Sequence, residues 1–306
     1  MGILGDMSSS RLRALLIVPL LLLGGWLGAL SDEARATPRP PGGAASLLGG
    51  FSAVAVQVFW IRGDLALRDR RMDEALYYFG LIHRLEPQLI AASAYFADEI
   101  GLGMADLQPD PAARAALAML GVRVLDRTVM DNVDDARAYI TRGHFLLTKI
   151  ALEEVKSVRF MEERGVSAFA ASRNDFRRAV ELNPNSIEAM NGFALASVKR
   201  GEELFAAAYA AGDGPALAVS QNIFRDAVSA YSALIKLQRI KWEGDPGADL
   251  LQGQRGMQRY AQRFVTVLDA GPDGLDAAYS ELFDSELFDS ELFDDVDPAM
   301  GWPEPR

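Results

Sequence analysis

The chain has 306 residues, of which half are apolar, and a net charge of −11, so it can form one large domain or a repeat array with tails. The absence of cysteine excludes disulfides, thiolate catalysis and cysteine metal sites. Its two histidines, His83 and His144, fall on different predicted helices, and we expect neither a metal nor a cofactor. Eleven acidic residues and one arginine in 271–306 leave residues 1–270 nearly neutral, without the concentrated basic surface that nucleic-acid binding needs.

Residues 1–13 are predicted to lie in the cytoplasm and residues 14–30 to form a membrane anchor. Arg11 and Arg13 precede 17 uncharged, mostly apolar residues, a length at the lower limit for crossing a bilayer and longer than a usual signal-peptide core. The arginines favour an inward N-terminus, which places the bulk of the chain outside the cytoplasm. Two outcomes stay open: a single-pass protein of the bacterial inner membrane facing the periplasm, or cleavage after Ser31 and a secreted periplasmic form.

Residues 31–45 are rich in proline and glycine, which prevent regular structure, and they are predicted to form a linker. From 46 to 268 apolar residues recur at helical spacing, and proline or glycine punctuates the pattern. The sequence therefore predicts an all-α domain. Its nine helices are expected at 46–68, 71–85, 88–103, 110–128, 133–162, 165–182, 186–209, 215–238 and 247–268.

Two of these helices end in the same pattern. An aromatic residue is followed after three, six and eight positions by a small or aliphatic residue, a leucine and a proline. The two copies are Phe79, Ile82, Leu85, Pro87 and Phe176, Ala179, Leu182, Pro184. Ala75 and Ser172 stand four residues before the aromatics, and Gly63 precedes Ala75 by twelve. A weaker third copy contains Ala227, Tyr231 and Leu234 without the proline.

These residues resemble the second half of the tetratricopeptide (TPR) motif. The resemblance implies a degenerate array of about four helix pairs plus a capping helix; a generic helical bundle is the alternative. The closing prolines Pro87 and Pro184 lie 97 residues apart where two regular repeats span about 68, so the intervening pairs must be longer, and the helix at 133–162 looks oversized. Leu48, Gly49, Gly50, Phe51 and Trp60 resemble the opening of bacterial membrane-anchored TPR proteins, a group that implies topology but no activity.

One basic helix face is a candidate for partner binding. Arg142, Lys149 and Lys156 are spaced by seven, so they would share one side of a continuous helix. Solvated surface charge is the simpler interpretation. The sharper hypothesis is that this stripe lines the concave surface of the array and receives an acidic segment.

Residues 269–306 are predicted to form a disordered acidic tail, which contains Ser-Glu-Leu-Phe-Asp three times in tandem. A period of five turns each copy away from the last on a helix and to the opposite face on a strand, so the three copies cannot be buried against one surface. They suit three equivalent docking motifs, although tandem duplication without function is equally open. The candidate anchors are Leu282, Phe283, Leu287, Phe288, Leu292 and Phe293.

The sequence contains no nucleophile motif, phosphate loop or calcium-loop spacing, and the chain is expected not to be an enzyme. It predicts a non-enzymatic, membrane-tethered scaffold for protein–protein interaction that assembles a cell-envelope complex. The alternative is a structural subunit of an integral membrane complex whose anchor packs with other spans. Both interpretations predict protein partners and a membrane contact through residues 14–30, with no nucleic acid and no small-molecule substrate.

Overall fold

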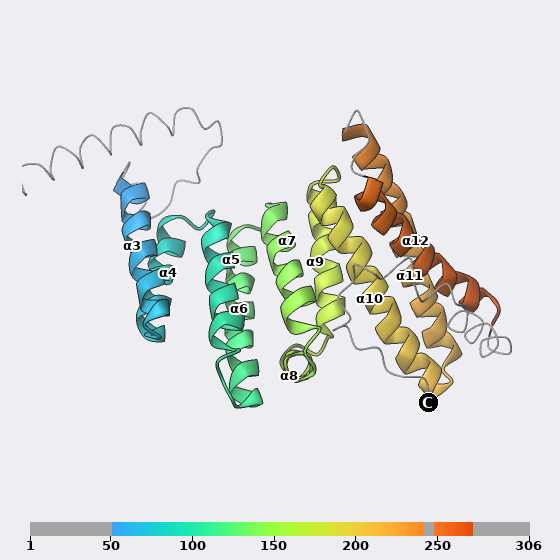
Figure 1. Ribbon diagram of the computed structural model, residues 1–306, viewed down its shortest axis with the longest axis horizontal. Helices are drawn as coiled ribbons and strands as arrows, with labels where there is room; N and C mark the ends of the chain where they lie inside the picture. The colour runs from blue at the N-terminus through green and yellow to red at the C-terminus, as the bar shows by residue number, and fades with distance from the viewer. Residues whose placement is uncertain (1–50, 242–247, 272–306) are drawn as a thin grey trace, which may run out of the picture. The chain divides into compact units, whose positions relative to one another are not determined.

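The computed structural model describes residues 51–241 and 248–271, all of whose regular elements are helices (Figure 1). The predicted N-terminal segments 1–13, 14–30 and 31–45 and the three tail motifs lie outside the described residues. The all-α prediction is confirmed. The chain divides into two compact units, Met1–Glu99 and Ile100–Arg306. No helix of the described part is both long and apolar enough to cross a membrane.

The first unit contains the helices α3 (Phe51–Arg68), α4 (Met72–Leu85) and α5 (Ile90–Asp98). Helices α3 and α4 form an antiparallel hairpin (Figure 1). The Phe79 ring of α4 packs edge-on against Trp60 at 5.9 Å and stacks on Phe96 of α5 at 4.4 Å. Tyr95 of α5 donates a 2.6 Å hydrogen bond to Asp64 of α3, so an aromatic cluster with one polar tie holds the three helices.

The second unit contains the remaining helices, preceded by a π-helical segment at Glu99–Met104 that crosses the unit boundary. Aspartate or serine side chains cap the N-termini of α6, α7, α9 and α10, and these helices begin one to three residues after the starts predicted at 110, 133, 165 and 186. The elements are α6 (Pro111–Asp131), α7 (Ala136–Phe145), a second π-helical segment at Leu146–Ile150, α8 (Glu154–Arg164), α9 (Ala168–Leu182), α10 (Ile187–Ala211), α11 (Gly214–Lys241) and α12 (Ala248–Asp269).

The single long helix predicted at 133–162 is wrong. The chain forms α7, continues as the π-helical segment and breaks at 151–153, after which α8 runs in a different direction and is seen end-on in Figure 1. The three successive residues Phe145, Leu146 and Leu147 are all buried here. A regular α-helix would turn its successive side chains to different faces, whereas the wider π-helical turn accompanies a locally rebuilt packing.

Five glycines of the described residues lie close to a phenylalanine ring of another helix, and in three of these pairs the phenylalanine follows the glycine by 16 to 33 residues. In these three pairs a Cβ atom added to the glycine would lie within 2.7–3.0 Å of the ring. The ring therefore packs directly against the backbone of the opposite helix, where only a glycine leaves enough room. The pairs are Gly63 with Phe79, Gly143 with Phe176, and Gly201 with Phe224.

Two of these contacts are each accompanied by a hydrogen bond from a serine to the glycine carbonyl. The hydroxyl of Ser172 donates to the carbonyl of Gly143 at 2.8 Å, and that of Ser220 donates to Gly201 at 2.9 Å. Both serines are fully buried and precede their phenylalanine by four residues. In α11 the aromatic residue that packs on a glycine is Phe224, which lies seven residues before Tyr231 of the weaker third sequence copy.

The second contact also accounts for part of the long spacing between the two closing prolines. Glycine and phenylalanine are 16 residues apart for Gly63 and Phe79, but 33 apart for Gly143 and Phe176. Helix α7 packs against α9, and the π-helical segment and α8 occupy the additional length between them. Helix α8 is thus an insertion within a helical hairpin.

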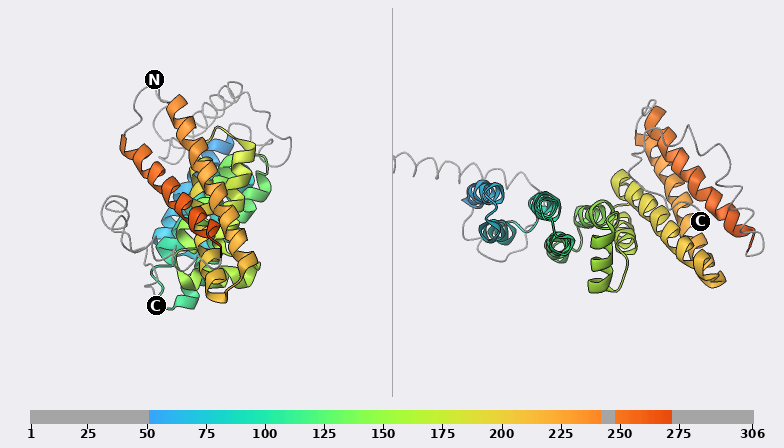
Figure 2. Two further views of the ribbon diagram at one scale, coloured as in Figure 1. Left: turned by 90° about the vertical axis from the view of Figure 1, so that its right-hand side faces the viewer. Right: turned by 60° about the horizontal axis from the view of Figure 1, so that its bottom comes forward.

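The last hairpin, α10 with α11, carries α12 on its outer side (Figure 2). Phe224 of α11 stacks on Phe264 of α12 at 4.4 Å, and Phe205 of α10 meets Phe264 edge-on at 5.4 Å. The exposed positions of α12 are mostly polar, at Gln252, Arg255, Arg259, Gln262 and Thr266. Such a polar outer face is typical of a helix that ends a repeat stack.

Candidate binding groove

The structure does not present Arg142, Lys149 and Lys156 as one exposed stripe. Arg142 lies on α7, Lys149 on the π-helical segment and Lys156 on α8, so the premise of one continuous helix face is wrong. Lys149 is partly exposed, whereas Arg142 and Lys156 form ion pairs within the chain. The partner-binding role of these three residues stays a prediction.

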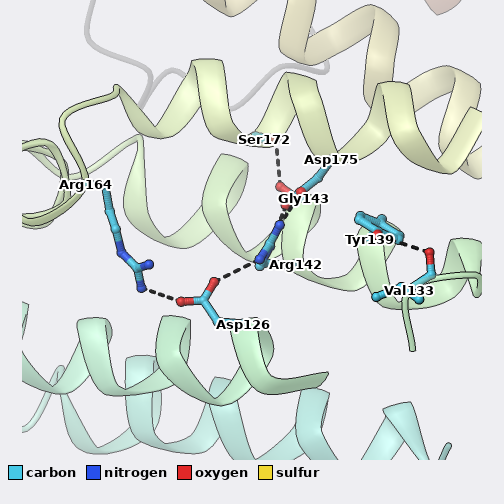
Figure 3. Close-up of polar contacts among 8 residues, drawn as sticks. All are labelled: Asp126, Val133, Tyr139, Arg142, Gly143, Arg164, Ser172 and Asp175. Atoms are coloured by element: carbon cyan, nitrogen blue, oxygen red, sulfur yellow. Dashed lines mark hydrogen bonds and ion pairs between the residues drawn. The ribbon is translucent and has the colours of Figure 1, made fainter. Parts of the chain in front are cut away.

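Arg142 links α7 to α6 and α9 (Figure 3). Its Nε and Nη2 atoms donate to the two carboxylate oxygens of Asp175 at 2.8 and 2.6 Å, and its Nη1 donates to Asp126 at 2.9 Å. Asp126 also accepts a hydrogen bond from Arg164, at the end of α8. Two arginines and two aspartates therefore join four helices, and this network has a structural role.

Burial sets the protonation behaviour of the network. Asp175 is almost fully buried, which raises the pKa of its carboxyl, although the hydrogen bonds from Arg142 act in the opposite direction. Burial alone would lower the pKa of Arg142, but its interactions with Asp175 and Asp126 together outweigh that effect and raise it. Arg142 is therefore the group that stabilises the ionised carboxylate of Asp175 in the interior of the unit.

Helix α8 buries one charged side chain and exposes several large apolar ones. Lys156 has only 2% of its side chain exposed, and its Nζ lies 2.7 Å from Glu153 and 3.7 Å from Asp106. In contrast, valines and a methionine on the opposite side of α8 are exposed, with Val158 at 52%. A buried charge and a cluster of exposed large apolar side chains are the informative exceptions to normal burial.

Val155 and Val158 border a groove of about 660 Å³ between α8 and the start of α6. Helix α6 contributes three alanines, whose small side chains leave the groove open, and α8 contributes two valines. Glu154, Arg159 and Glu162 lie at its polar margin. The apolar lining consists of Ala112, Ala115, Ala116, Val155 and Val158.

Both walls of the groove are held in place by specific contacts. Asp110 caps α6 by accepting hydrogen bonds from the backbone N–H groups of Ala112 and Ala113. Phe160 is buried on the inner side of α8, and Gly165 ends that helix with a left-handed φ of 70°. The exposed valines therefore lie on a helix that is held by packing at Phe160, rather than on a loop.

Sequence reasoning missed the groove and the acidic partners Asp106, Asp126 and Asp175. One signal was available for Asp175, because it stands at helical spacing between the buried Ser172 and Ala179. No comparable pattern in the sequence predicts the groove, since it forms between two helices that are far apart in the sequence. The predicted apolar anchors Leu282, Phe283, Leu287, Phe288, Leu292 and Phe293 lie outside the described residues.

The described residues contain no cluster of acidic or histidine side chains that could hold a metal ion. His144 packs edge-on against Phe176 with its Nε2 3.5 Å from Glu188, so it belongs to the packing between α7, α9 and α10. Comparisons with protein-family models, curated proteins and solved structures found no match to this chain. The geometry therefore defines an all-helical protein with an apolar surface groove.

Proposed function

We propose that the chain is a TPR-like, membrane-tethered scaffold, and that the groove between α6 and α8 binds an apolar segment of a protein partner. The observation that carries the proposal is the exposure of Val155 and Val158 on α8, at a groove lined by alanines of α6. These valines leave apolar area in contact with water, and a binding partner would cover it.

The TPR-like character of the proposal draws on the packing of the hairpins. Glycine-on-phenylalanine contacts recur in three helix pairs, with a small residue four positions before each ring. Ala75, Ser172 and Ser220 occupy those positions. The TPR motif combines the same residue types, and the insertion of α8 accounts for the irregular length of one pair.

The groove favours a partner that supplies aliphatic or aromatic side chains from a helix or an extended segment. Its alanine wall allows close approach of a backbone, and its valines offer apolar contact on the other side. Glu154, Glu162 and Arg159 supply both signs of charge at the margin, which can align a partner without selecting a strongly charged one. The anchor predicted at 14–30 would bring this groove close to partners in the same membrane.

The proposal can be tested by photo-crosslinking in membranes. We expect a photoreactive amino acid at Val158 of the full chain to form a discrete adduct with a partner, and a second substitution, Val155→Glu, to reduce that adduct by about tenfold or more. The same probe at Met130, which is 68% exposed on α6, serves as the matched control. Equal labelling from both positions would contradict the proposal, because it would mean that the groove attracts nothing specific.

A further inference from the structure

Helix α12 carries a row of arginines on its outer side. Arg255, Arg259 and Arg263, which we call the arginine row, follow one another at intervals of four residues and therefore share one face of the helix. Arg255 and Arg259 are exposed, and Arg263 is half-buried. No carboxylate of the described residues forms an ion pair with any of the three. Like charges at this spacing repel one another, so the row lacks a counter-charge.

The adjoining face of α11 adds further positive charge. Gln258 of α12 donates a 2.7 Å hydrogen bond to Ser232 of α11, so these two helix faces meet. Lys236 is exposed one turn beyond Ser232 on α11. Of the side chains described from 227 to 239 and from 251 to 268, five are basic and none is acidic. The basic ones are Lys236, Arg239, Arg255, Arg259 and Arg263.

The acidic tail of the sequence begins at the end of this same helix. Asp269 accepts hydrogen bonds from Gln221 and Arg225 of α11 at 2.7 and 2.9 Å, so the end of α12 is fixed to the hairpin. Gly271 then adopts a left-handed φ of 74°, a conformation that commonly ends helices. The sequence from 272 to 306, outside the described residues, has eleven acidic residues and one arginine, a net charge of 1 − 11 = −10.

We infer that the acidic tail binds the arginine row of its own chain. Arg255 precedes Gly271 by 16 residues, which correspond to ~24 Å along a helix. About eight residues of extended chain cover that length, at roughly 3.3 Å per residue. The first Ser-Glu-Leu-Phe-Asp copy begins at Ser280, nine residues after Gly271. The three copies can therefore reach every arginine of the row.

The spacing of the tail carboxylates also fits the row. Successive arginines of the row are four residues apart, which is ~6 Å along a helix. At the junctions between copies, two carboxylates stand two residues apart, first at Asp284 and Glu286 and then at Asp289 and Glu291. In an extended segment such residues lie on the same side, ~7 Å from each other. One junction thus presents two carboxylates to two neighbouring guanidinium groups, which bind carboxylates in a bidentate manner.

Tethering makes these weak contacts effective. An exposed ion pair contributes little by itself. Because the tail and the row belong to one chain, however, the effective concentration of the tail is on the order of millimolar. The bound tail covers the outer face of α12, so a partner that binds the tail must first displace it from the row. This regulation is separate from the groove between α6 and α8.

The absence of natural cysteine allows a direct test by disulfide formation. Gln262 is exposed beside the row on α12, and Ser285 lies between the two carboxylates of the first junction. We expect the full chain carrying Gln262→Cys and Ser285→Cys, in non-ionic detergent under mild oxidation, to form an intramolecular disulfide about fivefold faster than the same chain with Arg255→Glu and Arg259→Glu. An increase from about 0.1 M to 1 M NaCl should slow the reaction similarly, because it shortens the Debye length from about 10 to 3 Å.

A charge-swapped chain is the matched control. Asp284→Arg together with Glu286→Arg, added to the chain with both glutamates on α12, restores opposite charges and should raise the rate again. Because Arg255 and Arg259 are exposed, the helical circular dichroism should stay unchanged in all variants. A rate that the first reversal does not lower, or that the swap does not raise, would overturn the inference, since random encounters of a tethered tail do not depend on the sign of charge. A disulfide that forms only between two chains would overturn it as well.

Discussion

Replacement of Phe176 by alanine is expected to destabilise the second unit by about 3–5 kcal/mol, the range for removing a fully buried aromatic ring. The ring is 0% exposed and lies against two glycines at once, on α7 and α10. A Cβ atom added to Gly143 would lie 3.0 Å from the ring, and one added to Gly192 would lie 2.2 Å from it. Neither glycine backbone can move into the space left by the ring unless a whole helix shifts, so most of the cavity should remain. Urea denaturation followed by circular dichroism measures the loss.

A double-mutant cycle with Gly192 shows whether the cost arises from this contact. Gly192→Ala alone should destabilise by about 1–3 kcal/mol, because the new methyl group overlaps the ring. In the Phe176→Ala background the same methyl group enters the cavity, so its cost should disappear. Gly253→Ala, where a new Cβ would meet nothing within 4 Å, should stabilise by up to about 1 kcal/mol as an ordinary helix substitution. Additive effects of the first two changes would contradict the close contact.

The helix boundaries were largely predictable because they depend on local chemistry. Asp110 with Pro111, Ser167 and Ser186 start helices where a side chain can accept from the first backbone N–H groups. Gly165 ends one where a left-handed residue is needed. Each of these signals acts within four or five residues, and a single sequence contains all of that information.

The break at 151–153 depends on tertiary contacts instead. No proline or glycine occurs between Phe145 and Arg164, and every residue there can continue a helix. Lys156 on the inner side and Val158 on the outer side reverse the pattern that predicts burial from hydropathy. Partners on α6 and at Asp106 make that arrangement possible, and they are far away in the sequence.

For a related reason, the sequence alone does not show which aromatic residue of α11 packs on a glycine. Ser220, Phe224 and Ala227 are each seven residues before the residues Ala227, Tyr231 and Leu234 that the pattern had selected. A shift of seven returns to the same helix face, and the members of both sets are buried. Only the position of Gly201 on the neighbouring helix distinguishes the two registers.

Replacement of Arg142 by methionine should cost about 3 kcal/mol at neutral pH, because it leaves the buried Asp175 carboxylate without its guanidinium. Asp126 keeps Arg164 as a partner and is more exposed, so the penalty should fall mainly on Asp175. Arg137→Met is the matched control. Arg137 also bonds a carboxylate, Asp135, but its own side chain is 72% exposed, and loss of such a pair changes stability by less than about 1 kcal/mol.

The pH dependence of stability shows whether the Arg142→Met variant loses stability through an unpaired buried charge or through lost packing. Burial already raises the pKa of Asp175, and removal of Arg142 takes away the bonds that oppose this shift. A carboxyl whose folded-state pKa is raised contributes most stability below its unfolded pKa of about 3.9, and that contribution is lost as pH rises through the folded pKa. The deficit of Arg142→Met relative to the unsubstituted chain should therefore be largest near pH 7 and shrink toward pH 4.

A second substitution tests the same explanation at one pH. Asp175→Asn in the Arg142→Met background replaces the charged group by a neutral amide of similar size, so it should recover part of the lost stability at pH 7. In the unsubstituted background the same change should destabilise, because it breaks the bidentate pair with Arg142. If Asp175→Asn destabilised both backgrounds equally, the two residues would not be energetically coupled, and the ion pair would have no part in holding α7 to α9.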